Sequence, residues 1–105
     1  MEDHANPQFL NLTTTGWKSG KQHKIEIWFV EYDSRYYIMS ETFERAHWVQ
    51  NIIREPRVLF SLKNESFEGT ARIVNTVKEP QLSSDISKLM SSKEVDGLIV
   101  ELKHN

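Results

Sequence analysis

Apolar and polar residues alternate along most of the chain, as in β-strands that bury one face. The clearest example is the stretch 24–32, where Ile25, Ile27 and Phe29 fall on one face and Trp28 on the other. Further strands are predicted wherever the sequence alternates or is rich in β-branched and aromatic residues, at 9–15, 35–40, 57–63, 67–74 and 98–102. The pattern therefore predicts six strands.

The period changes to three and four residues after position 45, which is typical of a short helix with one buried side. Trp48, Val49, Ile52 and Ile53 form its apolar stripe. Pro56 ends this helix, because a proline disfavours helical geometry at the residue before it.

A second helix is expected to begin at Pro80, since proline suits the first turn of a helix. Its expected buried stripe consists of Leu82, Ile86, Leu89 and Met90.

The element order β-β-β-α-β-β-α-β predicts a mainly β fold, a small six-stranded antiparallel barrel with two short helices at its rim. So small a barrel is filled by its own side chains. A ligand would therefore bind the outer wall, where a second subunit could cover it. If Ile25, Ile27 and Phe29 fill the barrel, Trp28 faces outward, as tryptophans at interfaces and ligand sites do.

Length and composition narrow the class of protein. With 105 residues we expect a single domain at 9–105 after a flexible lead-in at 1–8. The net charge of −2 argues against a nucleic-acid binder, although lysines near tryptophans and tyrosines leave single-strand binding as a minor alternative. The chain has no cysteine, no apolar run of roughly 20 residues and a polar N-terminus, so we expect a cytoplasmic protein without a membrane span.

The most distinctive stretch is residues 13–21, Thr-Thr-Thr-Gly-Trp-Lys-Ser-Gly-Lys. Glycines let main-chain amides approach a bound group closely, and hydroxyl and ammonium groups suit a phosphate. The neighbouring Trp17 suits a flat ring or a partner protein. The stretch is not a Walker loop, because its glycine–lysine spacing and the strand that follows are wrong for one. The alternative is a hairpin with a merely solvated polar tip.

No catalytic or metal-binding residue is expected. His4, His23, His47 and His104 lack metal-ligand spacing, no Ser–His–Asp set or nucleophile elbow is recognisable, and the carboxylates are scattered. Any chemistry would therefore be carried by a cofactor.

Three blocks of the sequence resemble one family. Residues 13–23 with the strand 25–30, the block 47–58 (His-Trp-Val-Gln-Asn-Ile-Ile-Arg-Glu-Pro-Arg-Val) and the closing 97–102 resemble, in order, the deazaflavin-dependent nitroreductase and quinone-reductase family. That family belongs to the split-barrel flavin-binding superfamily, with pyridoxamine 5'-phosphate oxidase-like proteins. Trp17 departs from the pattern, since the family has an arginine there, and the connection between Ser40 and Trp48 is short.

The resemblance implies an FMN-binding split-barrel fold and a cofactor on its outer wall. The cofactor would be the deazaflavin coenzyme F-420, with FMN as the alternative. The implied cofactor-binding residues would contact the phosphate, the ring or the deazaflavin's acidic tail, or lie near the site; they are Lys18, Ser19, Lys21, His23, Ile27, Trp28, Met39, Ser40, Trp48 and Asn51. Lys24 is a further candidate for the acidic tail.

The implied function is an oxidoreductase, a homodimer that transfers a hydride from the reduced cofactor to a quinone, enone or nitro-type acceptor. One alternative is a non-catalytic flavin- or deazaflavin-binding or carrier protein of the same fold. Another is a structural partner protein that uses its outer tryptophans for assembly. The sequence leaves these alternatives open, because in the first two the cofactor supplies the reactive atom.

Overall fold

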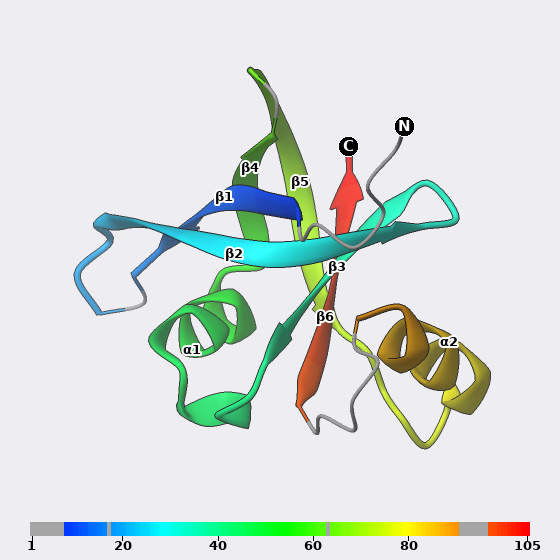
Figure 1. The fold of residues 1–105 in the computed structure, drawn as a ribbon. Helices are drawn as coiled ribbons and strands as arrows, with labels where there is room; N and C mark the ends of the chain where they lie inside the picture. The colour runs from blue at the N-terminus through cyan, green and yellow to red at the C-terminus, as the bar shows by residue number, and fades with distance from the viewer. Residues whose placement is uncertain (1–7, 17, 63, 91–96) are drawn as a thin grey trace.

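The computed structural model describes residues 8–16, 18–62, 64–90 and 97–105. In this part of the chain the order of elements, shown in Figure 1, is β1 (Gln8–Thr15), β2 (Gln22–Tyr32), β3 (Arg35–Ser40), the 3-10 turn η1 (Phe43–Arg45), α1 (His47–Arg54), β4 (Arg57–Leu62), β5 (Glu65–Ile73), α2 (Pro80–Met90) and β6 (Leu98–His104).

The strands close into a barrel in the order β1-β2-β3-β6-β5-β4, and every neighbouring pair is antiparallel. The predicted mainly β fold, an antiparallel barrel of six strands with two helices, is confirmed. The lead-in expected at 1–8 lies outside the described residues except for Gln8, where β1 begins.

Several strands are longer than the alternation predicted. β2 begins at Gln22 because its ladder with β1 continues through the pairs Thr14–His23 and Thr15–Gln22. β6 likewise continues to His104, which pairs with Gly69. The strand ends are polar, so hydrophobic alternation alone does not mark them.

The barrel interior is filled by the side chains that the alternation places on the inner faces. The buried members of this cluster are Leu10, Leu12, Phe29, Ile38, Ile52, Val58, Phe60, Ala71, Val100 and Leu102. Ile25 and Ile27 are partly buried against it, so the predicted inner face of β2 is correct. Ile52 of α1 also belongs to this cluster, which places that helix across the open end of the barrel.

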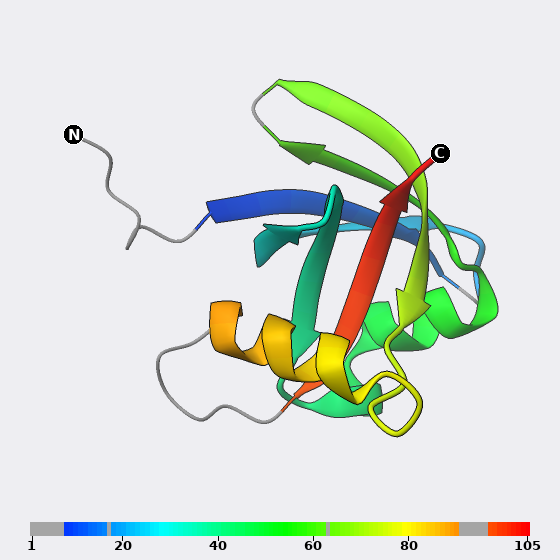
Figure 2. The same cartoon turned by 90° about the vertical axis from the view of Figure 1, so that its right-hand side faces the viewer.

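A second core lies between the barrel wall and α2, which Figures 1 and 2 show against the outside of the barrel. Its buried members are Tyr37, Val74, Ile86, Met90 and Ile99. Trp28 does lie on the outer face of β2, as predicted, but it packs against this second core and is only partly exposed.

The predicted stripe of α2 is wrong at one position. Ile86 and Met90 are buried and Leu82 is partly buried, but Leu89 is 50% exposed. Leu89 lies about 60° from Ile86 around an ideal helix, at the edge of the stripe. At the last turn of α2 the barrel wall leaves this edge uncovered, so spacing alone overestimates its burial.

A buried acid on β6 was not anticipated, because the sequence 98–102 reads as apolar. Glu101 is 4% exposed and accepts hydrogen bonds from Tyr37 Oη at 2.8 Å and from Arg72 Nη2 at 3.1 Å and Nε at 3.2 Å. Arg35 lies 3.7 Å from the same carboxylate. Arg72 also binds Glu79, 2.8 Å away, just before α2. This network connects β3, β5 and β6 to the segment that carries α2.

Candidate cofactor-binding site

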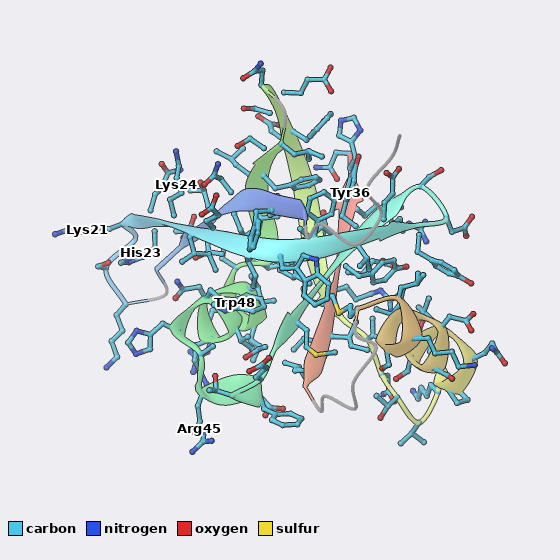
Figure 3. The ribbon with its side chains drawn as sticks, in the orientation of Figure 1. Lys21, His23, Lys24, Tyr36, Arg45 and Trp48 are labelled. Atoms are coloured by element: carbon cyan, nitrogen blue, oxygen red, sulfur yellow. The ribbon has the colours of Figure 1, made fainter. Side chains whose placement is uncertain are left out.

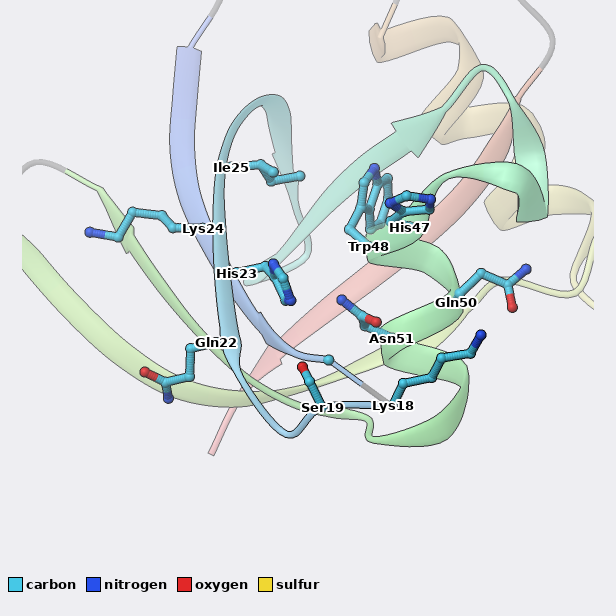
Figure 4. Close-up of a pocket in the computed structure, with 11 residues that line it drawn as sticks. Lys18, Ser19, Gln22, His23, Lys24, Ile25, His47, Trp48, Gln50 and Asn51 are labelled. Atoms are coloured by element: carbon cyan, nitrogen blue, oxygen red, sulfur yellow. The ribbon is translucent and has the colours of Figure 1, made fainter.

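A cavity of about 860 Å³ lies between the β1–β2 turn and α1 (Figure 4). Its lining residues come from the turn, the first half of β2 and one side of α1. Half of the predicted site residues are among them: Lys18, Ser19, His23, Trp48 and Asn51.

The turn between β1 and β2 is held by its own backbone. Gly16 N donates to Lys21 O at 2.6 Å, and Gly20 N donates to Gly16 O at 2.8 Å. Gly20 has a φ of +75°, a conformation that side-chain-bearing residues rarely adopt. A Cβ on Gly16 would lie 2.9 Å from His23 Nε2 and 3.1 Å from Ser19 Oγ. Glycine at position 16 therefore lets the imidazole and the hydroxyl come together.

The cavity is suited to an anion. Among the described residues, its lining includes Lys18, His23 and His47 but no aspartate or glutamate. Figure 4 shows Ser19, His23 and Asn51 turned toward a common space, with Lys18 at its edge. Ammonium, imidazole and hydroxyl groups around a hollow without carboxylates create a local field that favours a phosphate.

Asn51 anchors α1 to the barrel at the cavity's inner wall. Its Nδ2 donates to Thr14 Oγ1 at 3.0 Å, and both side chains are buried. This bond fixes the face of α1 that also carries Trp48. Thr14 belongs to the distinctive stretch 13–21, but the sequence did not predict that it is buried or that it accepts a hydrogen bond from Asn51.

A smaller cavity of about 360 Å³ lies farther along β2. It is lined by four more of the predicted residues, Ile27, Trp28, Met39 and Ser40, and by Trp48 again. Glu41, Thr42, Ala46 and Met90 complete the lining. Trp48 thus lines both cavities. The lining of the larger one includes basic side chains, and most of the lining surface of the smaller one is apolar.

Ser40 is a buried residue in the wall of the smaller cavity. It is 4% exposed, and its hydroxyl donates to the backbone oxygen of Phe43 at 2.9 Å. Phe43 has a φ of 57°, which is uncommon for a residue other than glycine. The hydroxyl of Ser40 therefore holds the turn after β3, and its predicted contact with a cofactor ring stays a prediction.

Lys21 does not line either cavity, unlike the other nine predicted residues. Figure 3 shows Lys21 extending outward from the end of β2 and Lys24 rising on the side away from α1. Only the base of Lys24 therefore borders the larger cavity, and its ammonium lies outside it. Trp17, the departure from the family pattern, lies outside the described residues.

Sequence reasoning missed His47 and Gln50, which also line the larger cavity. Gln50 and Asn51 follow His47 by three and four residues, so the three side chains lie on one side of α1. That spacing was readable once Asn51 had been chosen. It was overlooked because histidines without metal-ligand spacing were assigned to the surface.

Two classes of feature are missing from the described residues. No group of three or more histidine, aspartate or glutamate side chains there could hold a metal ion. Nor is any described helix long and apolar enough to cross a membrane.

Known structures with the same fold are distant in sequence. One is an F420-H2 dependent reductase, with a TM-score of 0.61, 19% identity and coverage of 91% of this chain and 94% of that chain. Another is a putative pyridoxamine 5'-phosphate oxidase from Listeria innocua, with a TM-score of 0.69, 15% identity and coverage of 93% and 84%. A third is described as a domain-swapped dimer, with a TM-score of 0.64, 18% identity and coverage of 91% and 80%.

Sequence comparison identifies the family. No curated protein matches the chain. The family model described as F420H(2)-dependent quinone reductase matches residues 4–95, and this range includes every residue that lines the two cavities. Because this match covers most of the chain, the protein belongs to the F420H(2)-dependent quinone reductase family.

Proposed function

We propose that the protein is a reductase that binds the deazaflavin coenzyme F-420 along β2 and uses it to reduce a quinone, enone or nitro-type acceptor. The observation that carries the proposal is the pair of cavities that share Trp48. The larger cavity has basic side chains in its lining and the smaller has mostly apolar ones, an arrangement that suits an elongated ligand with a phosphate and a flat ring. Membership of the F420H(2)-dependent quinone reductase family supports this choice of cofactor.

In the larger cavity, Lys18 and Ser19 would donate hydrogen bonds to the phosphate, and His23 would add a third polar contact. Charge-assisted hydrogen bonds of this kind contribute about 1.5–3 kcal/mol each. Asn51 holds the opposite wall in place through Thr14. These side chains would fix the cofactor's position along β2.

In the smaller cavity, Ile27, Trp28 and Met39 would pack against the ring and exclude water from it. The reduced deazaflavin, when bound, supplies the hydride. The side chains would then orient the acceptor against the ring, and none of them needs to act as an acid.

FMN is the alternative cofactor, since it also has a phosphate and a flat ring. It lacks the acidic tail of the deazaflavin. Lys21 lies beside the turn and the ammonium of Lys24 on the side of β2 away from α1, both outside the larger cavity, where their charges would attract a negatively charged tail that leaves it. Their position favours the deazaflavin.

We also propose that the protein acts as a homodimer. A structural relative is described as a domain-swapped dimer. Phe9 and Phe43, 51% and 42% exposed, are large apolar side chains that a second subunit would cover. Light scattering at several protein concentrations would give the mass of the assembly.

Turnover separates a reductase from a carrier. The reduced deazaflavin is mixed anaerobically with the protein and with a quinone, an enone or a nitro compound, and its reoxidation is followed by absorbance. We expect protein-dependent reoxidation with at least one acceptor class, and none with heat-unfolded protein. Tight cofactor binding without reoxidation by any acceptor would show that the protein is a non-catalytic carrier and not a reductase.

A further inference from the structure

Gly97, immediately before β6, lies in close contact with Met39 of β3. A Cβ added to Gly97 would overlap Cγ of Met39, lie 2.7 Å from its Sδ and lie 3.0 Å from the backbone oxygen of Ser40. The Met39 side chain therefore occupies the space that a side chain at position 97 would need.

Met39 and Ser40 line the smaller cavity, whereas Gly97 does not. Met39 consequently has the cavity on one side and Gly97 on another. Ser40 pairs with Leu98 in the β3–β6 ladder, so its backbone oxygen has little freedom to move. A larger residue at position 97 would therefore displace the flexible thioether of Met39.

We propose that Gly97 is a positioning residue that sets the depth of the smaller cavity by giving the Met39 side chain a place to lie. The proposal rests on the proposed function, because the ligand whose fit would change is the cofactor ring. With about 360 Å³ available, a displaced methionine side chain takes space that the flat ring would use.

The test is Gly97→Ala, which introduces no strain in φ because Gly97 lies outside the left-handed region. Fluorescence titration should show about tenfold weaker binding of both the deazaflavin and FMN, since overpacking a filled site is unfavourable. Binding of inorganic phosphate, followed by the NMR signals of Lys18 and Ser19, should not change. The double variant Gly97→Ala, Met39→Ala should bind the ring as tightly as Met39→Ala alone.

A measurement on the protein without cofactor distinguishes failure of this inference from failure of the proposed function. In the free protein, Gly97→Ala should shift the Met39 methyl signal, because this methyl moves relative to the neighbouring aromatic rings. An unchanged Met39 signal would overturn the inference, as would unchanged ring affinity in Gly97→Ala or a binding loss that Met39→Ala does not relieve. Wild-type protein that binds neither cofactor would refute the proposed function instead, and the methyl signal would still decide the role of Gly97.

Discussion

Replacing Lys18 by alanine is expected to weaken cofactor binding by tenfold or more while leaving the melting temperature of the free protein unchanged. Lys18 lines the larger cavity from an exposed turn. Loss of a charge-assisted hydrogen bond to a phosphate costs about 1.5–3 kcal/mol, and about 1.4 kcal/mol corresponds to a factor of ten in affinity. Exposed turn positions contribute little to folding stability.

Lys21→Ala is the matched control, since it removes the same charge from the same turn but Lys21 lines neither cavity. FMN, which has no acidic tail, should bind this variant within about twofold of wild type, since a screened surface charge contributes little. Both variants are titrated with FMN by fluorescence and melted without ligand. Equal losses of FMN affinity would show that the turn acts through its overall charge and is not the phosphate site.

Replacing Glu101 by alanine is expected to have the largest effect on stability, a loss of about 1–3 kcal/mol of unfolding free energy. The carboxylate is buried and accepts hydrogen bonds from Tyr37 and Arg72. Removing it leaves the hydroxyl of Tyr37 without its buried acceptor, whereas Arg72, whose side chain is 44% exposed, keeps its ion pair with Glu79. Urea unfolding measures the loss, and Glu65→Ala, at an exposed site on β5, should change stability by less than about 0.5 kcal/mol.

The same carboxylate predicts a dependence of stability on pH. Burial alone raises the pKa of Glu101, but hydrogen bonds from Arg72 and Tyr37 and the charges of Arg72 and Arg35 outweigh it, so the pKa lies below its ordinary value of 4.5. A carboxyl with a lowered folded-state pKa contributes stability above its unfolded pKa and loses it as the pH falls through the folded pKa.

Wild-type stability should therefore fall as the pH drops below about 4.5, and Glu79 and Asp85, whose pKa values are also lowered, act in the same direction. Glu101→Gln cannot titrate, so its unfolding free energy should fall less steeply over this range. If the unfolding free energy of Glu101→Gln fell as steeply with decreasing pH as that of the wild type, the role assigned to the Glu101 carboxylate would be contradicted.

Much of the fold was predictable because its signals are local. Alternation placed Ile27 and Phe29 toward the interior, and Pro56 marked the end of the first helix. Contacts between distant segments carry no such signal. The burial of Trp28 depends on α2, and the burial of Glu101 depends on Arg72 and Tyr37, each about 30 residues or more away in the chain.

The candidate site was predictable to a similar degree. Lys18 and Ser19 do meet His23 around one cavity, because the turn brings the ends of two paired strands together. Lys21, three residues after Lys18, points elsewhere, since side-chain directions around a turn follow no fixed period. The binding of a cofactor by these residues stays a prediction.

The most direct test of the account is a fluorescence titration of the purified, folded protein with the deazaflavin and with FMN. We predict saturable binding of both, with the deazaflavin bound more tightly because the positive charges of Lys21 and Lys24, outside the larger cavity, would attract its acidic tail. Folded protein that binds neither cofactor would contradict the account.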